Sequence, residues 1–304
     1  MTAVHGSPEA RSRGGHGAHG ERLGVTIWRL AGEYAAGVNR SPFFTTLRSG
    51  RLSRRRYVAF ITGMYPVVVG FNRALIRSIG KVDHVRQSGF VKHLAEQLRE
   101  EQDHNEIWRR KLEGYGVDHE QLYATLRDYM GRFELQDLDR MTAEVLGSVT
   151  DGGASLGPDC FPDSVFPEPV LALYHHLWMT ASYDGIDYWE HFASQSCMEV
   201  MIYDVVSTSI YPGVSGRAHL DGGPAAMRWW QEHARQGSIE SGRAIDEERH
   251  LELSKLALDR KTVNDTVRAQ IVSRAQDTMR LFAAAMMCQD FASKSFPLEH
   301  YLVS

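Results

Sequence analysis

The sequence is poor in cysteine, which excludes several classes of protein. It contains three cysteines, Cys160, Cys197 and Cys288, and no two of them form a CxxC pair. A disulfide-stapled domain and a cysteine-based zinc site both need more cysteines, at closer and more regular spacing. We therefore expect a protein of the reducing cytoplasm.

Long hydrophobic runs and a strong charge of one sign are also lacking. No apolar run approaches the ~20 residues that a membrane-spanning helix needs, so we expect no membrane contact. The formal net charge is −4 and the isoelectric point is near 6.4. A nucleic-acid-binding domain usually carries a basic excess, so we expect no nucleic-acid partner.

The first twenty residues lack the apolar core of a signal peptide. They are rich in glycine, histidine, serine and arginine, a composition that buries little apolar surface. We expect residues 1–20 to form a disordered tail and residues 21–304 to form one domain.

Alternation of apolar and polar residues, the pattern typical of strands, is absent over any convincing length, whereas helix-like spacing of apolar residues is frequent. The chain is 43% hydrophobic, which suffices for a substantial core. We predict an all-α fold with loops over 147–169 and 211–224. The predicted helices cover roughly 21–38, 43–48, 53–71, a segment ending near 113, 119–133, 137–146, 170–182, 186–209, 225–236, 238–258 and 263–291.

Two short motifs each combine carboxylates with a histidine. Glu101 precedes His104 by three residues, and Asp246 and Glu247 precede His250 by four and three. Positions three and four apart share one face of a helix, so each motif can present a carboxylate and an imidazole to one point. Two such pairs on facing helices can hold two metal ions, as in carboxylate-bridged di-iron proteins.

A site of that kind needs a further carboxylate within an apolar helix. Glu199 lies between apolar neighbours and is the first candidate, and Glu190 is the second. Each residue also has a purely structural interpretation: Glu101 belongs to a charge run typical of a solvated helix face, and Glu199 suits a core acid paired with an arginine. The two motifs together with a lone apolar-flanked glutamate favour the metal site.

The stretch from Ser41 to Val68, with Ser-Pro-Phe, Leu-x-x-Gly-x-Leu-Ser and Tyr57 followed by Phe60, resembles the heme-oxygenase-like superfamily, which includes the TenA and PqqC proteins. The segment 98–104 resembles its di-iron branch, the heme-oxygenase-like di-iron oxidases and oxygenases. The resemblance implies one helical bundle of that type; the alternative is a ferritin-like four-helix bundle.

Carried over to this chain, the resemblance makes Glu101, His104, Glu199, Asp246 and His250 the ligands of two Fe(II) ions, with O2 as co-substrate. The ferritin-like alternative keeps the iron and replaces Asp246 by Glu247. The interval between Glu199 and Asp246 is longer than the family pattern leads us to expect, and residues 211–224 look like an insertion.

The implied function is an oxidoreductase of specialised metabolism that acts on a small amine or amino-acid-like substrate. The reaction would be N-oxygenation, desaturation or oxidative C–C cleavage, with an external electron donor where the electron count needs one. Tyr65 is a candidate hydrogen-bond donor or redox residue, although a core aromatic is its plainer interpretation. Arg243 is a candidate anchor for a substrate carboxylate or a partner of a ligand carboxylate.

Two other classes of function remain open at this point. A metal-free enzyme or binding protein of the TenA or PqqC type predicts that the five ligand candidates do not converge. A helical scaffold protein predicts that both motifs are solvated. The last helix, with Leu281, Phe282, Ala285 and Met286, is a candidate homodimer face or a core element.

Overall fold

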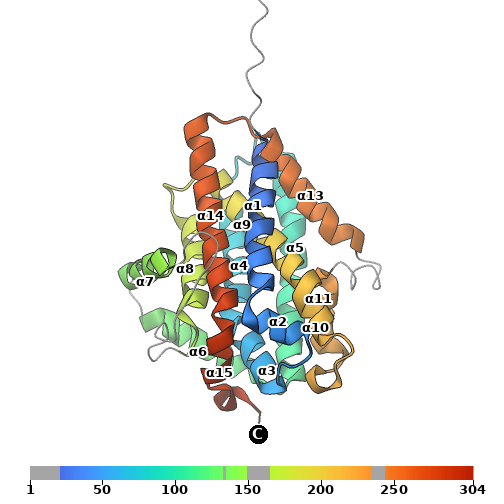
Figure 1. Cartoon of the computed structure of the whole chain (residues 1–304). Coiled ribbons are helices and arrows are strands. Elements are labelled where there is room, and N and C mark those ends of the chain that lie inside the picture. Colours follow the sequence, from blue (N-terminus) through green and yellow to red (C-terminus); the bar gives the residue numbers. More distant parts are fainter. Residues whose placement is uncertain (1–20, 133–134, 149–164, 235–243, 304) are drawn as a thin grey trace, which may run out of the picture.

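The computed structural model describes residues 21–132, 135–148, 165–234 and 244–303. Within these ranges the chain is helical, with one isolated β-bridge, Val117 to Leu302, and no strand (Figure 1). The all-α prediction is thus confirmed. The predicted tail 1–20, most of the loop 147–169, the helix start near Ser238 and the side chain of Arg243 lie outside the described residues.

The helices follow one another with short connections through most of the chain. Their bounds are α1 Leu23–Asn39, α2 Pro42–Arg48, α3 Arg54–Gly63, α4 Tyr65–Ile79, α5 Ser88–Gly114, α6 His119–Arg132, α7 Leu135–Ser148, α8 Glu168–Ser182, α9 Tyr188–Val205, α10 Tyr211–Val214, α11 Pro224–His233, α13 Ala244–Arg260, α14 Asp265–Met287 and α15 Gln289–Ser295.

Small residues let the central helices approach one another closely. Helix α1 packs against α9, α14 and α13, and α14 also packs against α8 and α9 (Figure 1). Ala31 and Ala35 of α1 and Ala284 and Ala285 of α14 are fully buried. Helix α4 packs between α8 and α5, and α5 packs against α11. This second group of contacts surrounds the pocket described below.

The predicted single helix 53–71 is wrong, because the chain turns at Met64. Helix α3 begins at its N-cap Ser53, whose hydroxyl accepts a hydrogen bond from the Arg56 amide. It ends at Gly63, and α4 begins at Tyr65 with a proline in its first turn, where the missing N–H costs nothing. The α4 residues Val67 and Phe71 line the pocket described below.

The stretch Arg54–Ile79 is also long and apolar enough to cross a membrane, by length and composition alone. Within its most apolar window, 78% is buried inside the bundle. The core helices of a folded domain share that property, so this stretch is accounted for by packing between helices.

Three other segments differ from the predictions. Residues 211–224 were expected to be a loop but contain α10 and a 3₁₀ turn, Ala218–Leu220. A π-helical turn, Val206–Ile210, joins α9 to α10. The expected last helix divides into α14 and α15 at Cys288. The α14 side chains considered for a dimer face point into the bundle, with Leu281, Phe282 and Ala285 fully buried.

Candidate functional site

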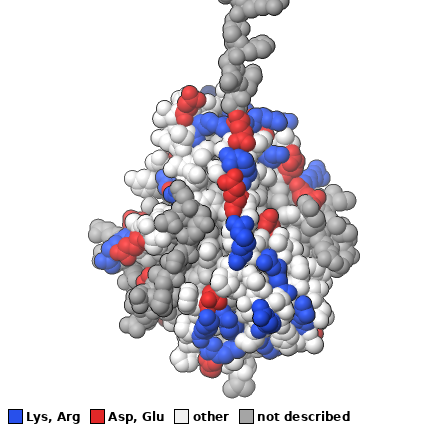
Figure 2. All heavy atoms as spheres, in the orientation of Figure 1, with Lys and Arg blue, Asp and Glu red and all other residues white. Residues whose placement is uncertain are grey.

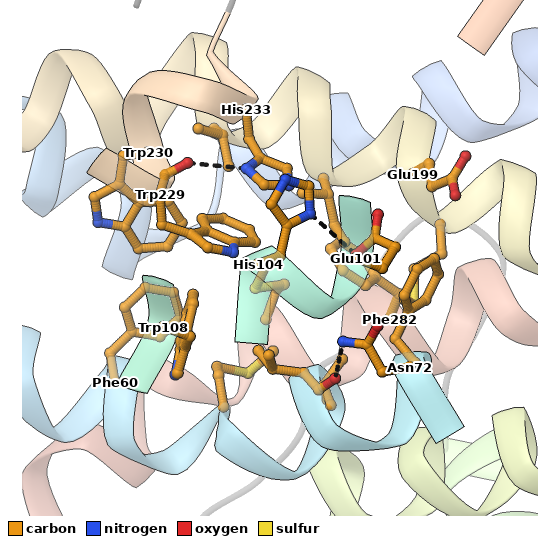
Figure 3. A pocket seen from close by; sticks show the side chains of 18 residues that line it. Phe60, Asn72, Glu101, His104, Trp108, Glu199, Trp229, Trp230, His233 and Phe282 are labelled. Carbon is orange, nitrogen blue, oxygen red and sulfur yellow. Dashed lines mark hydrogen bonds and ion pairs between the residues drawn. The ribbon is translucent and has the colours of Figure 1, made fainter. Parts of the chain in front are cut away.

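An apolar pocket lies between α4, α5, α9, α11 and α14 and encloses about 70 Å³ (Figure 3). A single water molecule needs roughly 10–15 Å³ by the same measure, so the space admits a small molecule. Most of the lining is aliphatic, aromatic or methionine side chain. The lining residues are Phe60, Met64, Val67, Val68, Phe71, Asn72, Glu101, His104, Trp108, Met198, Glu199, Ile202, Val206, Trp229, Trp230, His233, Phe282 and Met286.

Glu101 and His104 lie together on α5 and face the pocket, as their spacing predicted. His104 Nδ1 is 3.0 Å from Glu101 Oε2, so the two side chains form a hydrogen-bonded pair (Figure 3). Both are largely buried, with exposed side-chain fractions of 17% and 15%. On the other edge of the imidazole, Nε2 lies 3.9 Å from Oε2 of the buried Glu232.

Glu199 reaches the same pocket from α9. Its Oε1 accepts a hydrogen bond of 2.5 Å from Gln97 Nε2, and Gln97 lies one helical turn before Glu101 on α5. Glu190, the alternative candidate, lies elsewhere. It forms the capping box of α9 with Asp187 and faces Arg274 at 3.5 Å. Its role is therefore explained by helix capping.

His233 of α11 is the residue that sequence reasoning missed. Its ring lies 4.4 Å from the ring of His104, and its Nδ1 is 2.9 Å from the Trp229 carbonyl oxygen (Figure 3). Because a carbonyl only accepts, Nδ1 carries the proton and Nε2 keeps its lone pair. Burial, and then the neighbouring His104, hold the pKa of His233 well below its ordinary value. The imidazole is therefore neutral at physiological pH.

Glu232 directly precedes His233 and is buried, with 9% of its side chain exposed. Its Oε1 accepts a hydrogen bond of 2.9 Å from Arg228, while Oε2 faces His104. The pair Glu232-His233 follows two tryptophans on an amphipathic helix. An acid and a histidine that directly follow bulky aromatic residues were the signal available in the sequence.

The described part of the second motif does not line this pocket. Asp246, Glu247 and His250 lie on α13, but the structure describes only the backbone, not the side chains, of Asp246 and Glu247. His250 is half-buried and is not among the described residues that line the pocket. In the described part of the chain, no three His, Cys, Asp or Glu side chains are close enough to form a ready metal site.

Tyr65 is buried outside the pocket lining as the structure describes it. Its hydroxyl lies 2.8 Å from His119 Nε2, and the two rings meet edge to face. Burial, followed by the nearby Tyr123 and Glu120, raises the pKa of the phenol above its ordinary value. These contacts account for Tyr65 as a core aromatic residue that links α4 to α6.

No protein-family model matches this chain, and no curated protein matches it either. Among solved structures, it resembles a TenA homolog from Pseudomonas syringae pv. tomato str. DC3000, with a TM-score of 0.55 and 15% sequence identity. The match covers 88% of this chain and 91% of that one. The chain therefore has the all-α, heme-oxygenase-like fold of the TenA proteins rather than a ferritin-like four-helix bundle.

Proposed function

We propose that this protein is an O2-activating, non-heme di-iron oxidase or oxygenase that acts on a small, largely apolar amine. One observation carries the proposal: two carboxylates and two imidazoles from three helices, Glu101, His104, Glu199 and His233, line one apolar pocket, and a third carboxylate, Glu232, lies 3.9 Å from His104. Among the described residues no three of these donors lie within reach of one ion, so metal binding would require their side chains to move together. Two histidines with three or four carboxylates form the ligand set that di-iron sites in helical bundles use.

The donor set fits iron in kind, and its present hydrogen bonds show what binding would change. His104 Nδ1 is hydrogen-bonded to Glu101 Oε2, so His104 Nε2 and Glu101 Oε1 are the atoms that could bind metal without breaking this pair. His233 already has the tautomer that a metal ligand needs, with Nε2 unprotonated. In this proposal α11 supplies the final pair of ligands, Glu232 and His233, in place of Asp246 and His250.

The residues around these donors perform three tasks. Gln97 holds Glu199 in place, and the Trp229 carbonyl fixes the orientation of His233. The apolar lining excludes water from the reacting groups. When bound, the two irons would supply the electrons and the open coordination positions for O2 reduction.

Asn72 of α4 favours an amine over an amino acid as the substrate. It lines the pocket with 3% exposure, and its Oδ1 has no hydrogen-bond partner among the described residues. A buried acceptor without a partner costs free energy, and a substrate N–H would relieve that cost. The described lining holds no arginine or lysine that could bind a carboxylate.

Anaerobic titration with Fe(II), followed by Mössbauer spectroscopy, tests the proposal. We expect about two irons per chain, the stoichiometry of a di-iron site. His104→Ala and His233→Ala should abolish stoichiometric binding, and His84→Ala, an exposed histidine, should leave it unchanged. His250→Ala separates the two ligand sets, because binding should survive it if α11 supplies the ligands. The absence of stoichiometric iron would refute the di-iron proposal.

A metal-free enzyme of the TenA or PqqC type is the second candidate. The hydrogen-bonded pair Glu101–His104 favours it, because a carboxylate beside an imidazole in an apolar pocket is suited to general acid–base catalysis. A chain that binds no iron, yet takes up a small amine and loses that affinity in Glu101→Gln, would establish this alternative.

A further inference from the structure

Two of the tryptophans that line the pocket keep a buried N–H without a hydrogen-bond partner in the described part of the chain. Trp229 is 7% exposed and Trp108 is 3% exposed, and Nε1 of each ring finds no acceptor there. Trp230 differs, because its Nε1 donates to the Tyr57 hydroxyl at 2.6 Å. Buried polar groups of folded proteins are nearly always paired, so two unpaired donors at one wall of the pocket need an explanation.

Trp229 is the donor that is best placed to meet a molecule inside the pocket. Its ring stacks on His233, with centroids 3.7 Å apart and planes 13° from parallel. It meets the rings of Trp108 and Trp230 edge to face, at 86° and 88°. These contacts fix the plane of the ring. Figure 3 shows the nitrogen of Trp229 on the side of the ring that faces the pocket, whereas the nitrogen of Trp230 points away from it.

The opposite wall presents the complementary group, an acceptor. Asn72 Oδ1 has no partner among the described residues, and Asn72 Nδ2 donates to the Val68 carbonyl oxygen at 3.4 Å. Asn72 and Trp229 lie on opposite sides of the pocket (Figure 3). A ligand that donates to Asn72 at one end and accepts from Trp229 at the other would pair both groups at once. Pairing removes the free-energy cost of leaving two buried polar groups unsatisfied.

The charges around the pocket favour an uncharged acceptor at the Trp229 end. Two carboxylate side chains, Glu101 and Glu199, line the pocket, and a second negative charge nearby is disfavoured by Coulomb repulsion. No arginine or lysine belongs to the described lining. A ligand carboxylate would therefore lose its hydration on entering this apolar space without gaining a cation as partner.

We propose that the Trp229 indole N–H binds an uncharged oxygen of the substrate, at the end of the molecule remote from its amino group. A hydroxyl, carbonyl or amide oxygen suits this donor. The substrate class is then an amino alcohol, amino ketone or amino amide, rather than a plain alkylamine or an amino acid. The inference rests on the proposed function for the amino group alone; it involves no metal, and it applies equally to the metal-free alternative.

Isothermal titration calorimetry on the full, metal-free chain tests this inference with matched probes. Each straight-chain amino alcohol of a short series is compared with the alkylamine in which a methyl group replaces the hydroxyl. If the hydroxyl had no partner, the alkylamine would bind more tightly, because its methyl group buries more apolar surface. We expect the amino alcohol of matching length to bind the parent at least as tightly as its alkylamine does.

Trp229→Phe keeps an aromatic ring in place and removes the N–H. We expect this variant to bind the amino alcohol about five- to tenfold more weakly than the parent does, the loss of one hydrogen bond, and to bind the alkylamine as the parent does. In Trp230→Phe the lost N–H is one that Tyr57 already pairs, so both affinities should shift by the same factor. Trp189→Phe, whose ring stacks on Phe90 at 5.6 Å and does not belong to the described lining, should change neither. Circular dichroism verifies that each variant is folded.

The outcomes separate this inference from the proposed function. If alkylamines bind the parent more tightly than every amino alcohol, or if Trp229→Phe leaves the affinity for the amino alcohol unchanged, the inference is overturned while the amine proposal stands. An amino acid of the same length that binds more tightly than the amino alcohol would also overturn it, because the acceptor would then be charged. Binding of neither kind of amine would overturn the inference and the proposed amine substrate together. Because no iron is used, a failed iron titration does not affect these results.

Discussion

Lys111 offers the sharpest test of how the region around the pocket is stabilised. Its side chain is fully buried, and Nζ has no hydrogen-bond partner among the described residues. Nζ lies 3.2 Å from the ring centroid of Trp230 and 4.8 Å from that of Trp108. Burial lowers the pKa of Lys111 well below its ordinary value. A cation at that place would gain at most about 2 kcal/mol from the aromatic faces, less than the several kcal/mol that its desolvation costs.

The lowered pKa makes the free energy of unfolding depend on pH with a definite sign. Between the folded pKa and the unfolded value near 10.5, the unfolded chain binds one proton more than the folded chain. Stability therefore rises with pH in that window, by up to about 1.4 kcal/mol per pH unit from this group. Lys111→Met removes the contribution. We expect the variant to be more stable than the parent near neutral pH by roughly 1–3 kcal/mol, with the difference shrinking as pH rises.

Urea unfolding followed by far-UV circular dichroism measures this effect at about pH 7, 8 and 9 under constant ionic strength. Lys92→Met, an exposed lysine on the same helix, is the control and should run parallel to the parent. A Lys111→Met variant that is less stable than the parent, by an amount independent of pH, would refute the reasoning. That result would mean that the aromatic faces keep Lys111 charged.

Three further predictions concern packing, acid stability and helix capping, and urea unfolding measures each. Gly70→Ala should destabilise the chain by about 1–3 kcal/mol, because the new Cβ would lie 2.5 Å from a Tyr174 ring carbon; Gly32→Ala, with nothing within 4 Å, should stabilise it by about 0.5–1 kcal/mol. A Gly70→Ala variant at least as stable as the Gly32→Ala variant would contradict this. His191 is buried, and burial is the main cause that lowers its pKa to about 3; at pH values between this and the ordinary histidine pKa the unfolded chain binds the extra proton, so stability falls as the pH falls. In His191→Gln, the slope of the unfolding free energy against pH should be smaller by up to about 1.4 kcal/mol per pH unit in this range. A variant with the same slope as the parent would disprove this. Asp187→Ala should cost about 1 kcal/mol, because it removes the side-chain cap of α9, and an effect near zero would show the cap to be dispensable.

The sequence identified the α5 and α9 sides of the pocket because periodicity determines which residues share a helix face. Glu101 and His104 needed only the three-residue spacing, and Glu199 stood out by its apolar neighbours. His233 was missed because its partners come from other helices. Its nearness to His104 depends on how α11 packs against α5, and no spacing within α11 encodes that.

The positions of most helices were predictable, whereas their breaks were harder to place. The turn at Met64 interrupts an apolar run whose periodicity continues through it, so the pattern alone predicted one helix. Pro66 was the available signal, since proline is well tolerated in the first turn of a new helix. The division at Cys288 has no proline or glycine beside it, and local pattern gives no warning of it.

The pocket also bears on how the chain matures. Its walls span the sequence from Phe60 on α3 to Met286 near the end of α14. Contacts of such long sequence separation form late in folding, because the intervening chain must first be closed into a loop. The donors of α5 can therefore meet those of α9 and α11 in a closed, dry pocket only after α14 has docked. A nascent chain still lacking α14 would expose these carboxylates and histidines to water, so completion of the bundle is a precondition for the dry pocket that the proposed function needs.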